Sequence, residues 1–411
     1  MAWKFVIPLL RHNTRLAEGF NQRTLRDATP HAADIWIQAA SAGESYLAWE
    51  LLKNLRPGRP LRIHLTSNTR QGIEILQSAV DHTANDLTIS FFPFDRPAIM
   101  EAAVKLIHPR IMIFLETELW PGLLAALKRC GCKILIINGR ITEKSYNRYM
   151  IWPGLWKQLK PDNILAISPD DAKRFARLFD MKSVDIIPNI KFDRLSSFAG
   201  EIQTDNPLKT ILKPESAFVA IASVRKEEET DIEKIILYIR KKYPAAIIGI
   251  VPRHLHRVAY WQETLARLSI PFQMRSETVQ PATEGSVILW DKFGELMNVY
   301  EQAQAAFIGG SLAPLGGQNF LEALTCGVIP VIGPYWENFA WVGPEIIHEK
   351  LLQVATNWKE AAEMLINHLA SPPFRKTVRQ KALQFLKKRQ GGAMQACRVI
   401  NHLLEMSSKP Y

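Results

Sequence analysis

A glutamate stands in the first quarter of the sequence where it could take part in proton transfer. Glu44 follows Ser41 and Gly43, directly after the apolar run 35–40, and it falls where a helix should begin. Small residues at such a turn allow a ligand to approach the backbone. A carboxylate there can act as a general base. It can equally be a glutamate that stabilises the helix dipole, so both interpretations stand.

Further charged residues follow other apolar runs of the first half. Glu116 and Glu118 come after the run 111–115, beside a Trp-Pro pair that is unusual for simple helix capping. Arg140 follows another apolar run, and Lys191 could neutralise a phosphate in a cleft. On spacing alone, Lys191 is also consistent with a solvated surface charge.

The second half places cationic and glycine-containing segments after its apolar runs. Pro252 and Arg253 follow a very apolar run, and Phe293, Gly294 and Glu295 begin a helical pattern. An arginine at the carboxyl end of a strand in an open α/β sheet is well placed to bind an anion. These segments predict a site for an anionic ligand.

A glycine-rich stretch is the most informative part of this half. Gly310 and Ser311 precede a second glycine pair, and the residues 319–322 then open a helix. Loop glycines and a helix N-terminus can bind a phosphate, and Glu322 could accept hydrogen bonds from two ribose hydroxyls. Neither glycine pair matches the dinucleotide fingerprint or the Walker pattern, which disfavours NAD and ATP.

The elements that position these groups alternate between strands and helices in both halves. Such alternation predicts parallel sheets that are covered on both faces. We expect an N-terminal domain over 1–193, a linker over 194–214 and a C-terminal domain over 215–411, whose last helix could pack back on the first domain. Ligands of such sheets bind at the carboxyl ends of the strands. The expected strands are 35–40, 61–67, 111–115, 133–137, 164–168, 184–187, 217–222, 245–251, 286–290, 305–308 and 330–332.

Composition narrows the class of protein. The chain has 411 residues with a net charge of +11, which favours an anionic partner. The four cysteines are too scattered for a disulfide framework, which fits a reducing cytosol. The histidines are dispersed and no metal-binding pattern occurs, so we expect no metal and no cofactor.

The first residues suggest contact with a membrane surface. No apolar run approaches the ~18 residues that span a bilayer. An apolar, tryptophan-containing segment followed by arginines is nevertheless typical of proteins that lie on anionic membranes. A helix packed on its own domain is the alternative. The residues concerned are Trp3, Phe5, Val6, Ile7, Leu9 and Leu10, followed by Arg11, Arg15, Arg23 and Arg26.

Seven motifs together resemble the 3-deoxy-D-manno-octulosonic acid (Kdo) transferase family. Their order and spacing are similar over residues 35–340. The segment 222–228 resembles a further family pattern but lacks its threonine and glycine. The seven are Ile35–Glu44 (IWIQAASAGE), Glu116–Pro121 (ETELWP), Asn138–Thr142 (NGRIT), Asn189–Asp193 (NIKFD), Pro252–His254 (PRH), Gly294–Leu296 (GEL) and Gly316–Glu322 (GGQNFLE).

The resemblance implies a GT-B type α/β fold, with two doubly wound Rossmann-like domains facing a central cleft. It implies an inverting, metal-independent glycosyltransferase without a cofactor. The donor would be CMP-Kdo and the acceptor a lipid A precursor (lipid IVA), at the cytoplasmic face of the bacterial inner membrane. The enzyme would be peripheral or monotopic there, and nucleic acid is not an expected partner.

The resemblance also implies roles for individual residues. Glu44 corresponds to the proton acceptor, and Glu116 and Lys191 to groups that stabilise the transition state. Further contacts with the substrate are expected from Ser41, Gly43, Arg140, Gly310 and Ser311. CMP would be bound by Pro252, Arg253, Phe293, Gly294, Glu295, Asn319, Phe320, Leu321 and Glu322.

Two other functions remain open at this stage. One is a GT-B transferase that uses a different nucleotide-sugar, such as a UDP-sugar. The other is a non-enzymatic basic binding protein. Aromatic and basic residues do not interleave along a strand in the way that nucleic-acid-binding surfaces show, which disfavours a nucleic-acid module.

Overall fold

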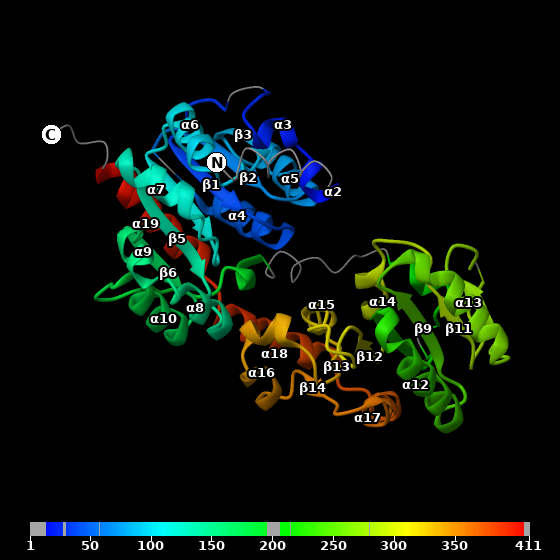
Figure 1. The fold of residues 1–411 in the computed structure, drawn as a ribbon. Coiled ribbons are helices and arrows are strands. Elements are labelled where there is room, and N and C mark those ends of the chain that lie inside the picture. The colour runs from blue at the N-terminus through cyan, green and yellow to red at the C-terminus, as the bar shows by residue number, and fades with distance from the viewer. Residues whose placement is uncertain are drawn as a thin grey trace. The chain divides into compact units, whose positions relative to one another are not determined.

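The computed structural model describes residues 14–27, 30–56, 58–194, 206–213, 215–278 and 280–406 (Figure 1). By its internal contacts, the chain divides into two compact units. Unit 1 consists of Met1–Arg194 together with Arg389–Tyr411, and unit 2 of Leu195–Lys388.

Unit 1 contains a seven-stranded parallel sheet in the order β3-β2-β1-β4-β5-β6-β7. Its central strands are continuous apolar runs, as expected of a sheet buried on both faces. The strands are β1 (Ile35–Ala39), β2 (Arg62–Ser67), β3 (Asp86–Phe91), β4 (Ile111–Leu115), β5 (Lys133–Gly139), β6 (Asn163–Ala166) and β7 (Asp185–Ile186).

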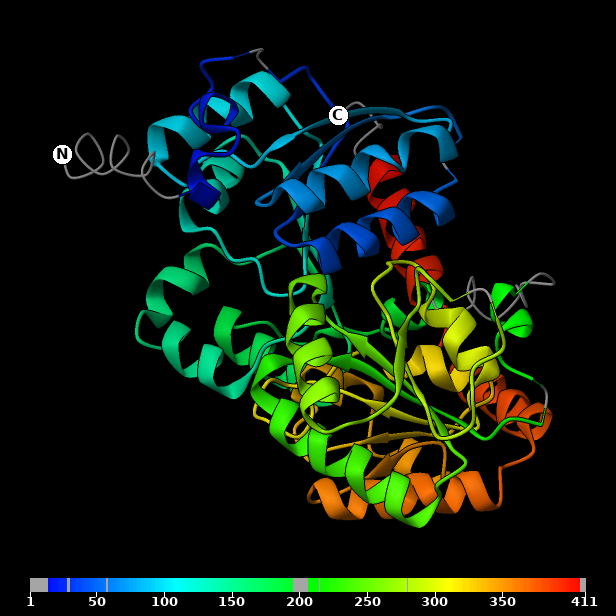
Figure 2. The ribbon, with the colours of Figure 1, turned by 90° about the vertical axis from the view of Figure 1, so that its right-hand side faces the viewer.

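Helices cover both faces of this sheet. Side chains of α4, α5 and α19 form one apolar core with alternate residues of the strands, and α19 lies beside α4 (Figure 2). Side chains of α6, α7, α9 and α10 form the second core on the other face. The helices are α2 (Thr14–Ala17), α3 (Phe20–Arg23), α4 (Ala42–Asn54), α5 (Arg70–Gln77), η1 (Val80–His82), α6 (Pro97–Ile107), α7 (Pro121–Arg129), α8 (Glu143–Tyr149), α9 (Pro153–Gln158), α10 (Pro169–Phe179) and α19 (Gly392–Met406).

Unit 2 contains a second seven-stranded parallel sheet, in the order β10-β11-β9-β8-β12-β13-β14. The strands are β8 (Phe218–Val224), β9 (Ile247–Pro252), β10 (Phe272–Met274), β11 (Val287–Leu289), β12 (Ala305–Ile308), β13 (Pro330–Ile332) and β14 (Gln353–Val354).

One face of this sheet forms a core with α12, α13 and α17, of which α12 and α17 lie side by side (Figure 2). The helices are η2 (Pro207–Thr210), η3 (Lys226–Glu228), α12 (Glu229–Lys242), η4 (Leu255–Arg257), α13 (Val258–Arg267), α14 (Leu296–Gln302), α15 (Leu321–Thr325), η5 (Glu337–Val342), α16 (Glu345–His348), α17 (Trp358–Ala370) and α18 (Arg375–Lys387).

The expected fold class of two doubly wound parallel sheets is confirmed. The division of the chain differs in detail from the expected ranges. Most of the expected linker, residues 195–205 and 214, lies outside the described residues, whereas η2 packs on α14 with Leu208 buried. The last helix, α19, belongs to unit 1 by its contacts.

The segment expected to contact a membrane lies mainly outside the residues that the structure describes. Residues 1–13, which contain the apolar run and Arg11, are not described. The expectation that Arg23 meets lipid phosphates is wrong: it is 3% exposed, and its guanidinium donates to the carbonyl oxygens of Glu18, Phe92 and Asn68. Arg26 is exposed. In the described part of the chain, no helix is both long and apolar enough to cross a bilayer.

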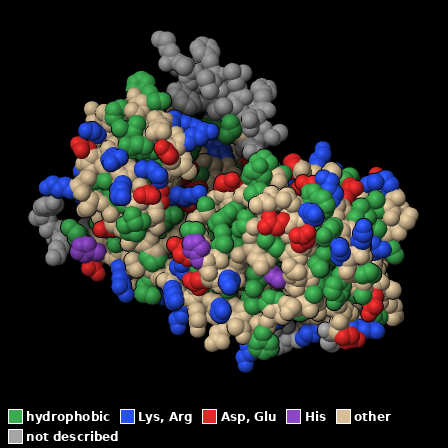
Figure 3. All heavy atoms as spheres, turned by 90° about the horizontal axis from the view of Figure 1, so that it is seen from below, with side chains coloured by type: hydrophobic (Ala, Val, Ile, Leu, Met, Phe, Trp, Pro, Cys, Tyr) green, Lys and Arg blue, Asp and Glu red, His purple; other side chains and the backbone are tan. Residues whose placement is uncertain are grey.

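On the face shown in Figure 3, basic side chains are scattered among acidic and apolar ones.

Candidate functional site

The topology of unit 1 brings two of the predicted catalytic residues to the same place. The chain order in the sheet reverses between β1 and β4, and the crevice at such a switch point is where open α/β sheets bind ligands. Glu44 stands shortly after β1, and Glu116 directly follows β4. Both glutamates therefore lie at the carboxyl edge of neighbouring central strands.

The first turn of α4 holds Glu44 in place. Its Oε2 accepts a hydrogen bond of 2.8 Å from the Ala40 N–H, and its Oε1 accepts one of 3.2 Å from the Ser41 hydroxyl. Ser41 is also the N-cap of the helix, because its Oγ accepts from the Glu44 N–H. Burial raises the pKa of Glu44 to about 8, helped by the negative charges of Glu118 and Glu116.

Glu118 is a functional candidate to which the motif reading assigned no role. Burial also raises its pKa, and the indole N–H of Trp120 donates a hydrogen bond of 2.8 Å to its Oε2. It contributes more than Glu116 does to the raised pKa of Glu44. A second acid after β4 was visible in the sequence, but only the fold brings its charge close to Glu44.

Glu116 and Lys191 form an ion pair, with 2.5 Å between Lys191 Nζ and Glu116 Oε1. Both side chains are half-buried. Glu116 also adopts φ +54°, which is uncommon for a residue with a side chain and is often found where function determines the backbone. The structure thus brings Glu44, Glu116 and Lys191 to one edge of unit 1.

The segment that carries Lys191 is anchored at both ends. The buried Asn138 Oδ1 accepts from the Ile190 N–H, and the Asn189 Oδ1 accepts from the Lys191 N–H. Asp193 accepts hydrogen bonds from the N–H groups of Gly391 and Ala393, at 2.6 and 2.7 Å, where α19 begins. The last helix therefore fixes the end of the lysine segment.

Three residues expected to contact the substrate from unit 1 have different surroundings. The Ser41 hydroxyl is engaged in capping α4, and Gly43 lies in the first turn of that helix. A Cβ on Gly43 would have only ordinary contacts, so the local packing does not require a glycine there. Arg140 is half-buried in the loop after β5.

Unit 2 has a small pocket that gathers two of the predicted CMP-binding segments. Its volume is about 160 Å³. It is lined by Pro252 and Arg253 after β9, by Phe293–Glu295 before α14, and also by Ser223, Trp290 and Lys292. The Arg253 side chain is exposed, and so is Phe293, at 74%. Sequence reasoning had not identified Trp290 or Lys292, and it had named Ser223 only as part of the segment 222–228.

The side chain of Glu295 is engaged in hydrogen bonds with other residues of unit 2. Its carboxylate receives two hydrogen bonds from the Arg275 guanidinium, at 2.8 and 3.0 Å, and one from the Trp290 indole N–H. The positive φ of Gly294, +86°, lets the chain turn into this arrangement. Glu295 therefore shapes the pocket wall.

The third predicted CMP-binding segment, 319–322, does not line this pocket. The Asn319 side-chain amide donates a hydrogen bond of 2.8 Å to Glu322 Oε1 at the start of α15. The side chains of Phe320 and Leu321 are each 1% exposed, so they belong to the core and can offer a ligand only their backbone.

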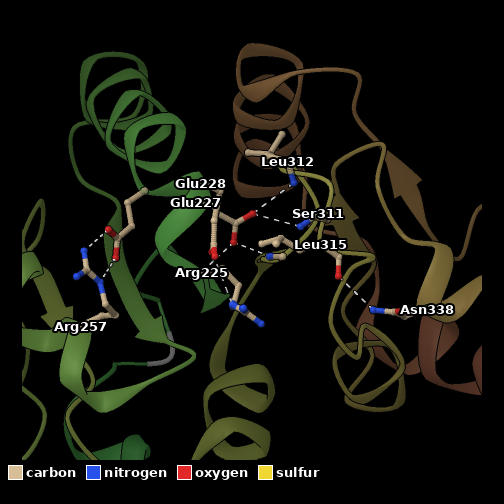
Figure 4. A network of polar contacts seen from close by, with 10 residues as sticks. Arg225, Glu227, Glu228, Arg257, Ser311, Leu312, Leu315 and Asn338 are labelled. Atoms are coloured by element: carbon tan, nitrogen blue, oxygen red, sulfur yellow. Dashed lines mark hydrogen bonds and ion pairs between the residues drawn. The ribbon is translucent and has the colours of Figure 1, made fainter.

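The glycine-rich loop after β12 is organised by a buried acid that the sequence reading had not singled out. Glu228 is 2% exposed, and its carboxylate accepts from the N–H groups of Gly310, Ser311 and Leu312, at 2.5, 3.2 and 3.3 Å (Figure 4). It also accepts from the Arg225 N–H at 2.9 Å. The signal was the acid pair of the segment 222–228, whose partners became evident only in the fold.

The N–H groups of Gly310 and Ser311 thus donate to Glu228, and the expected contact of these two residues with the substrate stays a prediction. Ser311 is wholly buried, and its hydroxyl donates to the Ile308 carbonyl and accepts from the Gly333 N–H. The structure therefore uses Ser311 to hold the loop together. Among the described residues, no group of three or more His, Cys, Asp or Glu side chains could hold a metal ion.

Comparison with known proteins agrees with the motifs. The family of 3-deoxy-D-manno-octulosonic-acid transferases (kdotransferases) matches residues 14–194. A transferase of that name from Haemophilus influenzae is 30% identical over 374 residues, covering 87% of this chain and 84% of that protein. One from Bordetella pertussis is 27% identical over 382 residues, covering 88% of this chain and 86% of that protein.

A solved structure supports the fold. UDP-GlcNAc 2-epimerase from Neisseria meningitidis aligns with a TM-score of 0.58 over 90% of this chain and 99% of that one, at 13% identity. At this identity the likeness concerns the fold alone, and the expected GT-B type of two Rossmann-like domains is confirmed. The chain therefore belongs to the 3-deoxy-D-manno-octulosonic acid transferase family and is a glycosyltransferase.

Proposed function

We propose that this chain transfers Kdo from CMP-Kdo to a lipid A precursor, with inversion and without a metal ion, at the cytoplasmic face of the inner membrane. The observation that carries the proposal is the group of Glu44, Glu116 and Lys191 at the switch point of unit 1. The choice of Kdo as the transferred sugar rests on the relatives, which are named Kdo transferases. The net charge of +11 is suited to binding CMP-Kdo and a lipid A precursor, which are both anionic.

Glu44 is the proposed general base. Its carboxylate would take the proton of the acceptor hydroxyl while the hydroxyl oxygen attacks the anomeric carbon of the donor. The bond from that carbon to the phosphate oxygen breaks, and CMP leaves with the electron pair. A raised pKa suits this role, because a carboxylate with a pKa near the working pH is a stronger base than an ordinary one.

The Glu116–Lys191 pair would stabilise the charges that develop as this bond breaks. Preorganised charged groups in a partly buried site act strongly on a transition state, because they need little rearrangement. The ion pair at 2.5 Å and the anchoring of the lysine segment by Asn138 and Asp193 fix these groups before a substrate binds.

Unit 2 would bind the donor. The pocket beside Arg253 offers a positive side chain and the turn at Gly294, and Asn319 and Glu322 would bind the ribose. Arginine and oriented amides can stabilise a departing phosphate, a task that a metal ion performs in many other transferases.

The direct test is an assay with CMP-Kdo and a lipid A precursor, with the products resolved by mass. The matched variant is Glu44→Gln, which is nearly isosteric but cannot accept the proton. We expect turnover to fall about 10²–10⁴-fold, while CMP binding and the unfolding temperature stay near those of the wild type. Near-normal turnover of Glu44→Gln would contradict the assignment of the base.

Another GT-B transferase that uses a UDP-sugar is the main alternative, because the fold alone does not determine which nucleotide-sugar is bound. Thermal unfolding with CMP and with UDP separates the two. Protection by CMP alone supports the proposed donor, whereas protection by UDP alone supports the alternative.

A further inference from the structure

An arginine to which no role has been assigned lies at the switch point of unit 2. The chain order in this sheet reverses at β8, which lies between β9 and β12. Arg225 is the first residue after β8, so it stands at the crevice where such sheets bind ligands. Val224 pairs with Pro252, and Arg225 and Arg253 therefore follow neighbouring strands at the same level.

The backbone around Arg225 is fixed by a buried acid. Glu228 accepts from the Arg225 N–H and, with the same carboxylate, from three consecutive N–H groups of the loop after β12 (Figure 4). One side chain thus ties the ends of two adjacent central strands together. Because the Glu228 carboxylate already accepts from the backbone N–H groups of that loop, an anionic ligand at this edge has to be bound by positively charged side chains.

The Arg225 side chain itself is partly exposed, at 29%, and its Cγ lies 3.6 Å from where a Cβ on Gly310 would be. Among the residues that the structure describes, its one ion pair is a long one, with 3.9 Å between Nε and Glu227 Oε2. Burial and the positive charges of Arg225 and Arg253 lower the pKa of His254. The positive charges of Arg225 and Arg253 therefore both affect the same residue, His254, at this edge of the sheet.

We propose that the Arg225 guanidinium, beside Arg253, binds an anionic oxygen group of the nucleotide-sugar donor. This inference rests on the proposed function. CMP-Kdo carries a phosphate and a sugar carboxylate, and a guanidinium pairs with either through two parallel hydrogen bonds. Lysine preserves the charge but cannot form this fork.

The experiment measures CMP binding by calorimetry and the KM for CMP-Kdo in the transfer assay, for the wild type, Arg225→Ala and Arg225→Lys. Lys226→Ala is the matched control, because it removes the same charge from the exposed neighbouring position. If Arg225 binds the phosphate, Arg225→Ala weakens CMP binding about 10- to 100-fold. If it binds the carboxylate, CMP binding stays unchanged and the KM for CMP-Kdo rises by a similar factor.

The remaining outcomes each decide against the inference in a distinct way. Arg225→Ala with normal CMP binding and a normal KM overturns it while the proposed function stands. An equal loss in Lys226→Ala shows a general effect of charge and also overturns it. A wild type that does not bind CMP removes the proposed donor, and the inference falls with it. Thermal unfolding checks that the variants fold, and Arg225→Lys, whose loss should be smaller, carries the test if the alanine variant is unstable.

Discussion

The carboxylate of Glu44 is held by the first turn of its own helix, near the negative charges of Glu116 and Glu118. These surroundings predict how the transfer activity depends on pH. Below a pH of about 8 the carboxyl is protonated and cannot accept a proton, so activity should rise with pH as it ionises. We expect kcat/KM for transfer to increase about tenfold per pH unit below that value and to level off above it. A profile that is flat between pH 6 and 9 for the wild type would contradict the role of Glu44 as base.

The charge of Glu118 contributes to that raised pKa, and its removal should be visible in the same profile. Glu118→Gln keeps the shape and removes the charge, so the midpoint of the pH profile should move to lower pH. Glu143→Gln, which removes an exposed acid at the start of α8, should leave the midpoint in place. Equal midpoints in Glu118→Gln and the wild type would show that the charge of Glu118 does not contribute to the raised pKa of Glu44.

At the scale of the element, Asp193 connects the lysine segment to the beginning of α19. Its two carboxylate oxygens accept separately from two N–H groups at that helix start, and an asparagine replaces one of these oxygens with an NH2 group that cannot accept. Asp193→Asn should lower the free energy of unfolding by about 1–3 kcal/mol. Urea unfolding measures the change, with the exposed Asp185→Asn as the control of equal charge.

The central strands of both sheets were predictable because they are long and apolar. The runs at β1, β4, β9 and β12 stand at the expected residues within two positions at either end. The edge strands β3, β10 and β14 were missed. They are short or half-buried, and so lack the continuous apolar run that distinguishes a central strand.

The candidate site was predictable only where a residue follows a recognisable strand. Glu44, Glu116 and Arg253 satisfy this condition. The role of Glu228 could not be predicted, because its partners at Gly310 and Leu312 lie 82 and 84 residues away in the sequence. Asp193 bonds to Ala393 across 200 residues. Contacts of such range depend on the packing of whole elements, which local patterns do not reveal.

At the scale of the whole molecule, the charge of +11 predicts binding to anionic vesicles. Each basic residue near such a surface contributes about 1 kcal/mol, and this part weakens with salt. We expect binding that decreases with salt yet persists in part, and that falls when Trp3, Phe5, Ile7, Leu9 and Leu10 are replaced by serine. Vesicle sedimentation measures both effects.

A second variant makes the vesicle test specific. Ile151 and Trp152 are consecutive residues, each 69% exposed, in the turn after α8. If the N-terminal segment is the anchor, replacing these two by serine leaves sedimentation unchanged. If sedimentation is lost with this pair but survives the N-terminal replacement, the membrane contact lies at the turn.

The place of α19 in unit 1 has a consequence for the order in which the chain folds during synthesis. Ala396, Cys397 and Ile400 share a core with Leu47 and Leu51 of α4, yet all of unit 2 is encoded between them. At about 5–20 residues per second, the apolar face of α4 waits roughly 17–70 s for its partner helix to be made. The unit that begins first on the ribosome is therefore completed last, and during that interval it depends on chaperones or on its own partial core to avoid aggregation.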